Sequence, residues 1–407
     1  MTRWISILCA WAGLISANAE IAVTASSSQA GSEAVAAFDG EQFGTNLVWR
    51  GYSHAKLWHW QVDFGETRTI GSILQVQGDQ DFVFEHAAKA WRWLASDDGV
   101  KWTVVPGASA TNDARLFRVI RLGQPIQAHL VRLEISEATG EYPALREVSF
   151  FARTNQDVHF PDWVLVVNDT DSPKLPGEGK EFIPLARRAE AKFVPAQQVW
   201  LDRFNNDFLQ VEPHPLCVFV SGSFKDWCEV KREDFRGMAG VLAHGEIPIW
   251  ASCGGAQALA ILAENGIDHE WDCPHCRDPK DPKTPIYTHI GHTDMKKCGD
   301  YSGCIFERGP HSVSVVKNDR AFDGLGDSFQ VMESHCGQIA YMPRGWEWVV
   351  GPGEGTLTKH QAFRRVGRPI YAAQFHIEMS GTPETSNQIM RNFLAIARDW
   401  NNRQAAK

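Results

Sequence analysis

A single cysteine lies where an apolar run gives way to two glycines and a helix-like segment. The stretch that begins at residue 248 is PIWASCGGAQALAILAENG, and it contains Cys253. Small residues around such a corner predict a sharp turn from a strand into a helix, which leaves the corner side chain at the carboxyl edge of a sheet. Backbone N–H groups at the start of a helix favour a thiolate over a thiol. The pattern predicts that Cys253 is a catalytic nucleophile, and the alternative is a structural thiol.

A nucleophilic thiolate needs a base, and the best candidate lies far downstream in RPIYAAQFHIEMSGTPET. The run IYAAQFHIE predicts a strand, and residues two apart on a strand point to the same face. His376 and Glu378 have this spacing, so Glu378 can accept a hydrogen bond from one imidazole nitrogen while the other nitrogen faces Cys253. The alternative is a His–Glu pair on the surface at the end of a strand.

These two motifs together resemble those of the class I glutamine amidotransferase superfamily, which are G-x-C-x-G-x-Q for the nucleophile and H-x-E for the base. Here they are ASCGGAQ and FHIE, and the resemblance covers about residues 160–400. Between them, HSVSVV and VMESHCGQIAYMPRGWEWV resemble later strands of the family. The resemblance implies that Cys253 is the nucleophile, that His376 is the base and that Glu378 orients it.

The resemblance also assigns residues to the substrate. Gly222, in the turn VSGSF, and Gly254 would supply N–H groups to an oxyanion, and Gln257 would help to hold the glutamyl part of the substrate. The chain departs from the pattern at Ala251, which replaces the first glycine, and in SGSFKDW, which replaces a Gly-Gly-Pro turn. The second departure weakens the assignment of Gly222 and favours an alternative function, that of a catalytically silent binding or adaptor protein.

A cysteine-rich insertion follows the nucleophile helix at residues 268–305. It contains four cysteines, Cys273, Cys276, Cys298 and Cys304. The C-x-x-C half suits a structural zinc ion, although the second pair is spaced more loosely than usual. Two disulfides explain the same residues in an oxidising compartment, and unpaired thiols are the third alternative. We expect the insertion to narrow the mouth of the active site. For His335 and Cys336, in a later loop, no second catalytic role is predicted.

The elements that would position these residues form a doubly wound α/β domain, predicted over residues 163–400. WVLVVND, LCVFVSGSF and IPIWASC are predicted strands, and the last is followed directly by the helix-like AQALAILAEN, with Gly266 as its end. The alternation of strands and helices is typical of a mostly parallel, flavodoxin-like sheet. The polar segment at 154–162 predicts a linker before this domain.

Residues 20–153 have a different pattern and predict an all-β jelly-roll sandwich. Short alternating runs such as LWHWQVDFG, IGSILQVQG and AHLVRLEIS are separated by turn signals. The motifs AAFDG, WQVDFG, WRWLASDDGVKW and LREVSFFA, in this order, resemble the discoidin or coagulation-factor C-domain family, which has a galactose-binding-like fold. The resemblance implies a glycan or cell-surface ligand bound by loops at one end, and a calcium ion near Asp39.

Four residues lie in the loop where such a ligand would bind: Trp49, Arg50, Tyr52 and His54. Aromatic rings stack on sugars, and arginine donates paired hydrogen bonds. The same residues could instead pack on the second domain, and the sandwich could be a spacer without a ligand.

The N-terminal sequence MTRWISILCAWAGLISANAE predicts a secretory signal peptide at residues 1–19, because an arginine precedes a short apolar run and small residues end it. The run is shorter than the ~20 residues of a membrane span, and no later stretch is long and apolar enough. We therefore expect a secreted or periplasmic protein with no transmembrane segment after signal removal. A net charge of −9 argues against nucleic acid as a partner.

The expected function is that of an exported, cysteine-dependent amide hydrolase. It would act on a small glutamine or γ-glutamyl amide through an acyl-enzyme, and it would require no cofactor for catalysis. The sandwich would hold it near a carbohydrate or cell surface. Hydrolysis is favoured over amide transfer, because no synthetase-like segment follows the α/β domain and export separates the chain from ATP-dependent acceptors.

Overall fold

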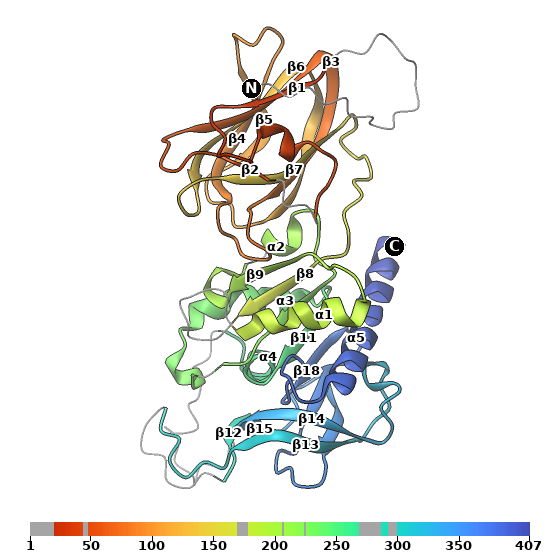
Figure 1. Ribbon diagram of the computed structural model, residues 1–407. Coiled ribbons are helices and arrows are strands. Elements are labelled where there is room, and N and C mark those ends of the chain that lie inside the picture. Colours follow the sequence, from red (N-terminus) through yellow and green to blue (C-terminus); the bar gives the residue numbers. More distant parts are fainter. Residues whose placement is uncertain are drawn as a thin grey trace. The chain divides into compact units, whose positions relative to one another are not determined.

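The computed structural model describes residues 20–43, 48–168, 178–205, 207–223, 225–267, 286–291 and 299–407. They form two compact units, which Figure 1 shows with their helices and strands labelled. The first unit comprises the residues up to Phe160 together with Val211–Pro213, and the second comprises Pro161–Gln210 and His214–Lys407. No helix among the described residues is long and apolar enough to cross a membrane.

The first unit is the all-β sandwich that the sequence predicts. Its strands are β1 (Ala22–Ala25), β2 (Trp49–Arg50), β3 (Trp58–Gln77), β4 (Ala88–Ser96), β5 (Thr103–Ala110), β6 (Phe117–Ala138) and β7 (Ala144–Phe151). They pair in the order β2-β7-β3-β6-β4-β5, and β1 also pairs with β3. The ladder between the long strands β3 and β6 shifts register between Asp63 and Arg68. Such irregularities bend the strands, which a sandwich needs where a strand passes its corner.

Tryptophan side chains fill the interior of the sandwich. Trp60 and Trp93 are fully buried and pack edge to face, with ring centroids 6.3 Å apart. The indole N–H of Trp60 donates to the Ala34 carbonyl at 2.8 Å, and that of Trp93 donates to Gln75 Oε1 at 3.2 Å. Buried tryptophans contribute large apolar areas, and their polar N–H groups here have partners.

The second unit is an α/β domain. Its strands are β8 (Val164–Asn168), β9 (Ala196–Trp200), β10 (Cys217–Val220), β11 (Ile249–Ser252), β12 (Tyr287–His289), β13 (Glu307–Val315), β14 (Ser328–His335), β15 (Gly337–Ile339), β16 (Trp346–Pro352), β17 (Ala362–Arg365) and β18 (Ile370–Ala373). Its helices are α1 (Phe182–Glu190), α2 (Asp207–Gln210), α3 (Arg236–His244), α4 (Gly254–Asn265) and α5 (Pro383–Ala405). Nine strands form one sheet in the order β14-β13-β16-β17-β18-β11-β10-β8-β9, and β12 pairs with β15.

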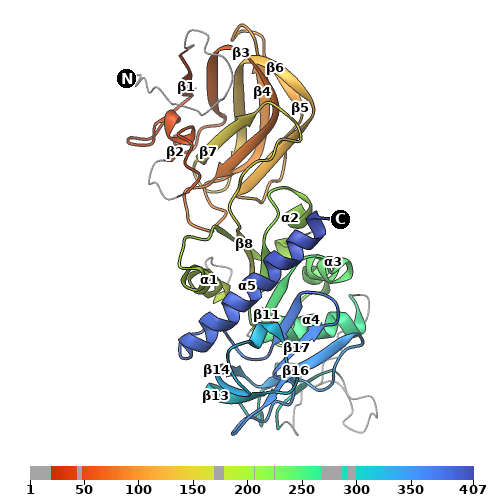
Figure 2. The same cartoon turned by 90° about the vertical axis from the view of Figure 1, so that its right-hand side faces the viewer.

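The parallel part of this sheet has the flavodoxin-like strand order. The strands β9, β8, β10, β11 and β18 are neighbours and pair in parallel. Numbered along the chain, this is the order 2-1-3-4-5. Helix α1 packs with α5 and α3 packs with α4, and the two pairs lie on opposite sides of the sheet (Figure 2). Every residue of β8, β10, β11 and β18 is buried, as expected for parallel strands covered on both faces.

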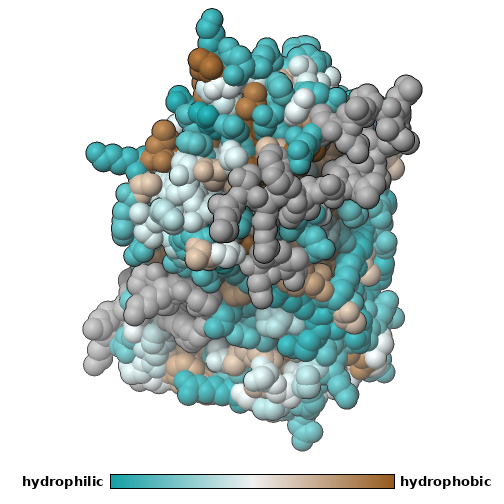
Figure 3. Space-filling model, turned by 45° about the horizontal axis from the view of Figure 1, so that its top comes forward, coloured by the Kyte–Doolittle hydropathy of each residue, from teal (hydrophilic) through white to brown (hydrophobic). Residues whose placement is uncertain are grey.

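The face of the molecule in Figure 3 is mostly hydrophilic, and the hydrophobic residues on it are scattered among hydrophilic ones. Scattered apolar residues are normal on a protein surface and do not by themselves indicate a binding site. We therefore sought the functional site at the edge of the parallel sheet, where ligands of doubly wound domains bind.

Candidate active site

The carboxyl ends of three neighbouring parallel strands carry the predicted catalytic residues. Gly222 follows β10, Cys253 follows β11 and His376 follows β18. Because β10, β11 and β18 are adjacent and parallel, their carboxyl ends meet at one edge of the sheet. Three segments that are far apart in the sequence therefore contribute to one site.

Cys253 occupies the sharp corner between β11 and α4. Its φ of 49° and ψ of −113° form a combination that residues with a Cβ rarely adopt. The Cys253 N–H donates to the Ala373 carbonyl at 2.8 Å, and its carbonyl accepts the N–H of Gln257 at 3.0 Å. These two bonds tie the corner to β18 on one side and to the first turn of α4 on the other.

Two glycines after Cys253 are required by close backbone contacts. A Cβ on Gly254 would lie 2.4 Å from Ser223 N, and a Cβ on Gly255 would lie 2.7 Å from Ser221 O. The Gly255 N–H also donates to Ser221 O at 3.0 Å. Any larger residue at either position would push the turn after β10 away from Cys253. The small residues of ASCGGAQ thus hold two strand ends together.

The thiol of Cys253 and the imidazole of His376 line the same small space. A Cβ on Gly222 would lie 3.2 Å from His376 Cε1 and 3.7 Å from Cys253 Sγ. The Nδ1 atom of His376 is 2.6 Å from Glu378 Oε1. Its Nε2 atom is buried and has no hydrogen-bond partner among the described residues, which leaves this nitrogen to take the proton of the thiol.

The charges around His376 favour its protonated form. Burial lowers the pKa of His376, but the Glu378 carboxylate and the Cys253 sulfur raise it by more, so that this pKa lies well above its ordinary value. An imidazolium beside a sulfur stabilises the thiolate. The arrangement therefore suits a thiolate–imidazolium pair at neutral pH.

The strand predicted over IYAAQFHIE is wrong in its second half. β18 ends at Ala373, whose carbonyl accepts the Cys253 N–H, and the chain then leaves the ladder. His376 forms an isolated bridge with Met332, and its N–H donates to the Met332 carbonyl at 2.8 Å. The strand stops because no parallel neighbour continues beyond the edge of the sheet. The contact between His376 and Glu378 forms outside regular strand structure.

Gln257, assigned to the substrate by resemblance, has protein partners at both ends of its side chain. Its Oε1 accepts from Trp227 Nε1 at 3.1 Å, and its Nε2 donates to Gln374 Oε1 at 3.2 Å. Gln374 Nε2 in turn lies 3.7 Å from Cys253 Sγ. In this structure Gln257 therefore positions Gln374 beside the thiol. Sequence reasoning missed Gln374, and its place directly before FHIE was the available signal.

Gly222 and Gly254 lie where donors to an oxyanion would be needed. Gly254 is the first residue of α4, and the first N–H groups of a helix have no partner within it. Among the residues that the structure describes, no acceptor is found for the N–H of either glycine. Their location beside Cys253 agrees with the predicted role, which stays a prediction.

His335 is engaged by carboxylates on β13 and β14. Its Nε2 lies 2.8 Å from Glu333 Oε2 and 3.4 Å from Glu307 Oε2, and its Nδ1 lies 2.9 Å from Gly337 O. The side chains of His335, Glu333 and Glu307 are all buried. Because both ring nitrogens of His335 have partners, this residue connects the two strands.

Of the four cysteines predicted to bind zinc or to form disulfides, only Cys304 belongs to the described residues. The other three, Cys273, Cys276 and Cys298, lie outside the described ranges, so that prediction stays untested. Cys304 lies with His289 and Cys336, and one ligand atom of each lies within 4.8 Å of the others. Sequence reasoning did not predict this set, because His289 and Cys336 carry no spacing motif that connects them.

In the sandwich, the structure brings a second carboxylate to Asp39. The Oδ1 atom of Asp39 accepts the Glu41 N–H at 2.9 Å, and Glu147 Oε2 accepts the Gly40 N–H at 3.2 Å. Burial raises the pKa of Asp39, and burial raises that of Glu147 to about 7. Two adjacent carboxylates among backbone groups offer the oxygen ligands that calcium prefers. The residues present therefore fit the predicted calcium ion, and Glu147, inside LREVSFFA, was missed.

The predicted sugar-stacking role of Trp49 is wrong. Trp49 is fully buried, and its Nε1 donates to Ser27 O at 3.0 Å, so its ring faces the core of the sandwich. Arg50 forms a salt bridge with Asp79 at 2.6 Å. Tyr52 is 59% exposed and His54 is also exposed, so these two remain candidates for a ligand face.

Comparison with known proteins matches each unit to a family. A family model described as Glutamine amidotransferase class-I matches residues 185–396. A second model, described as F5/8 type C domain, matches residues 22–148. A GMP synthase [glutamine-hydrolyzing] of Gibberella zeae is 27% identical over 182 residues, which cover 44% of this chain and 26% of that protein.

Two solved structures are similar to the two units. One is described as a GMP synthase subunit protein from Thermoplasma acidophilum, which is 19% identical over 61% of this chain and 100% of its own, with a TM-score of 0.44. The other is a family 32 carbohydrate-binding module from Clostridium perfringens in complex with galactose, which is 20% identical over 32% of this chain and 92% of its own, with a TM-score of 0.28. Among the curated relatives, the chain spans between 16% and 60% of their length.

Proposed function

Because this chain belongs to the class-I glutamine amidotransferase family, we propose that its α/β unit hydrolyses the amide of glutamine or of a γ-glutamyl compound through a thioester on Cys253. One observation carries the proposal. The thiol of Cys253 and the buried Nε2 of His376 face the same space, and Glu378 holds the other nitrogen at 2.6 Å. Nucleophile, base and orienting carboxylate are therefore together in one site.

In the first half-reaction, the Cys253 thiolate attacks the amide carbonyl carbon. The carbonyl oxygen takes the negative charge, and the N–H groups of Gly222 and Gly254 stabilise it. The imidazolium of His376 then donates its Nε2 proton to the amide nitrogen. The C–N bond breaks, ammonia or an amine leaves, and the acyl group stays on sulfur. Glu378 keeps the ring oriented throughout, because it accepts the Nδ1 proton.

In the second half-reaction, neutral His376 takes a proton from a water molecule, which attacks the thioester carbonyl. The C–S bond breaks, the carboxylic acid leaves, and the thiolate–imidazolium pair is restored. Gln374 would place a donor beside the sulfur in both halves, because its Nε2 lies 3.7 Å from Sγ and Gln257 fixes its oxygen end. No step needs a cofactor.

We favour hydrolysis over amide transfer. The other unit of this chain is an F5/8 type C sandwich, which has no chemistry for activating an ammonia acceptor. The predicted signal peptide would place the protein outside the cytoplasm, away from ATP-dependent acceptors. The GMP synthase relatives hydrolyse glutamine by their names, and this chain would share that half of their reaction.

The sandwich would attach the enzyme to a carbohydrate or a cell surface. Its support is the match to the F5/8 type C family, together with the exposed side chains of Tyr52 and His54. An exposed tyrosine ring can stack on a sugar ring. A calcium ion held by Asp39 and Glu147 would brace the adjacent turn. A glycan array, probed with and without calcium, tests whether this unit binds a ligand.

The amidase proposal is tested with purified protein lacking residues 1–19, incubated with glutamine and with γ-glutamyl amides while ammonia release is measured. Wild type should release ammonia, and Cys253→Ser should not. A glutamine-like chloroketone should label wild type at Cys253 and should fail to label His376→Ala. Folded wild type that neither turns over nor labels would reject the enzyme and favour a catalytically silent binding protein.

A further inference from the structure

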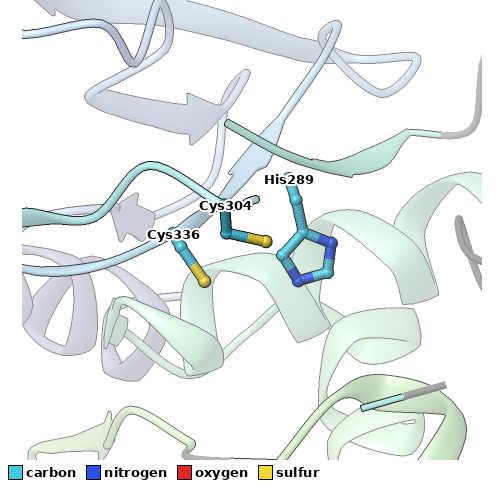
Figure 4. A group of neighbouring side chains, drawn as sticks. All are labelled: His289, Cys304 and Cys336. Carbon is cyan, nitrogen blue, oxygen red and sulfur yellow. The ribbon is translucent and has the colours of Figure 1, made fainter. Parts of the chain in front are cut away.

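Three ligand-type side chains converge beside the active site without belonging to it. His289 ends β12, Cys304 lies in the segment before β13, and Cys336 lies between β14 and β15. One ligand atom of each lies within 4.8 Å of the other two. Figure 4 shows the three side chains pointing toward one another from separate segments. His289 and Cys336 are buried, and Cys304 is partly buried.

Backbone hydrogen bonds fix these segments to one another. His289 pairs with Gly337 in the antiparallel ladder of β12 and β15. The Ile290 N–H donates to the Cys336 carbonyl at 2.8 Å, and the Ile305 N–H donates to the Ile290 carbonyl at 2.9 Å. Each ligand residue is therefore in, or next to, a backbone bond that holds its neighbour. The cluster is built into the fold, and its geometry does not depend on a flexible surface side chain.

We propose that His289, Cys304 and Cys336 bind one thiophilic divalent cation, and that this cation is zinc. Thiolate and imidazole are the ligands that zinc prefers, at about 2.3 Å from sulfur and about 2.0–2.1 Å from nitrogen. The corners of such a tetrahedron are roughly 3.4–3.8 Å apart. Ligand atoms that already lie within 4.8 Å of one another need only move inward by about 1 Å or less.

The fourth position suits an oxygen ligand. The Oδ2 atom of Asp226 lies 4.0 Å from His289 Nε2, and both side chains are fully buried. Tyr287 also places its hydroxyl 3.0 Å from the same nitrogen. Histidines that bind metals commonly have a carboxylate close by, which completes the coordination or orients the ring. Asp226 provides that carboxylate here.

Charge balance also favours a dication. Burial raises the pKa of Cys336 to about 12, and burial raises that of Cys304 as well. Asp226 adds negative charge near both thiols. Without a cation, both groups stay protonated at neutral pH. Zinc would displace one proton from each thiol, so that two thiolates balance its double charge and two protons go to solvent.

The ion would brace a wall of the proposed active site. Strand β14 passes Cys253, since Ser334 O lies 3.9 Å from Sγ, and Cys336 follows two residues later. A Cβ on Gly337 would lie 3.0 Å from Gln257 Nε2, so this segment also contacts the residue that positions Gln374. Zinc would thus tie β12 and the segment before β13 to the strand end that lines the thiol. Metal binding itself does not depend on the proposed amidase activity.

This site competes with the four-cysteine zinc site predicted from the sequence, because both use Cys304. The two proposals differ in their other ligands. His289 and Cys336 belong only to the site proposed here, whereas Cys273 and Cys276 belong only to the four-cysteine site. Substitutions in these two pairs therefore distinguish the sites even though Cys304 is shared.

The test uses the full mature chain, purified with a reductant and freed of metal, then titrated with Zn²⁺ and separately with Co²⁺. Zinc per chain is measured by elemental analysis after gel filtration, and thiolate ligation is seen as sulfur-to-cobalt charge-transfer absorption. Wild type should bind one equivalent more than His289→Ala and one more than Cys336→Ser. The double variant Cys273→Ser, Cys276→Ser should keep that equivalent.

Circular dichroism checks that each variant is folded, and Cys336→Ser is the nearly isosteric change if His289→Ala does not fold. Wild type should also melt at a higher temperature with zinc than without it, and Cys336→Ser should lose this difference. Retention of the equivalent by both His289→Ala and Cys336→Ser would overturn the proposal. A disulfide between Cys304 and Cys336, found by peptide mapping of protein isolated without reductant and resistant to zinc, would overturn it as well.

Discussion

Replacing Cys253 with alanine and, separately, with glycine measures the strain stored at the catalytic corner. Both changes remove the sulfur, and they differ only in the Cβ. With φ at 49° and ψ at −113°, a residue with a Cβ is strained here, by a cost of order 1–3 kcal/mol. Glycine relieves this strain. The comparison therefore isolates the backbone at the corner from the chemistry of the thiol.

The opposing costs of glycine are taken from a matched position in the same helix. Ala258 is fully buried inside α4, where the backbone is regular. Changing it to glycine should lower the free energy of unfolding by about 2 kcal/mol, from ~1 kcal/mol of helix propensity and ~0.8 kcal/mol for the buried methyl. At Cys253 the relief of strain offsets these terms, so Cys253→Gly should be roughly as stable as Cys253→Ala, or more stable.

The assay is urea unfolding of the full chain, followed by circular dichroism and by protection of α4 amides from hydrogen exchange. The Ala-to-Gly loss at position 258 should exceed the Ala-to-Gly loss at Cys253 by ~1–3 kcal/mol. Equal losses at the two positions would refute the reasoning, because the corner would then carry no strain. Alkylation is unsuitable as a readout here, since both Cys253 variants lack the thiol.

Three further predictions concern the site and the sandwich. Gly222→Ala should fill the space between Cys253 and His376 and slow labelling by a glutamine-like chloroketone about 10²–10³-fold, with an unchanged melting temperature; labelling at the wild-type rate would contradict this. Glu378→Gln removes a charge that raises the pKa of His376, so alkylation of Cys253 by iodoacetamide should be slower at neutral pH and should need a higher pH, whereas an unaltered pH profile would exclude the orienting role. The buried Glu147 carboxyl group has a pKa raised by burial from 4.5 to about 7, so its neutral form stabilises the fold below pH ~4.5 and that stability is lost as pH rises toward 7. Relative to Glu147→Gln, wild type should lose ~3 kcal/mol of unfolding free energy over this range without calcium, and calcium should restore it; equal pH dependence of the two proteins would argue against the buried carboxylate.

Features that depend on neighbouring residues were predictable from the sequence. The corner at Cys253 follows from small residues between an apolar strand and a helix, and those residues are dictated by contacts as short as 2.4 Å. The alternation of strands and helices predicted the doubly wound unit, and short alternating runs predicted the sandwich. The pairing of His376 with Glu378 was also predictable, although the strand that was expected to carry them ends at Ala373.

Features that join distant segments were not predictable in the same way. Gln374 reaches the thiol because β18 lies beside β11, and Glu147 reaches the turn at Asp39 because the last strand of the sandwich returns to it. Trp49 seemed suited to a ligand face, but its ring is buried in the core. Residue type limits what a side chain can do, whereas burial and partner are set by packing.

By itself, the sequence determined the two fold classes, the corner at Cys253 and the spacing of His376 and Glu378, because steric limits and hydrophobic periodicity act over a few neighbouring residues. Only the tertiary structure decided which strand ends meet, which nitrogen of His376 faces the thiol, and that His289, Cys304 and Cys336 lie together. Those contacts depend on strand order and register, and these arise from the packing of the whole sheet rather than from any short segment.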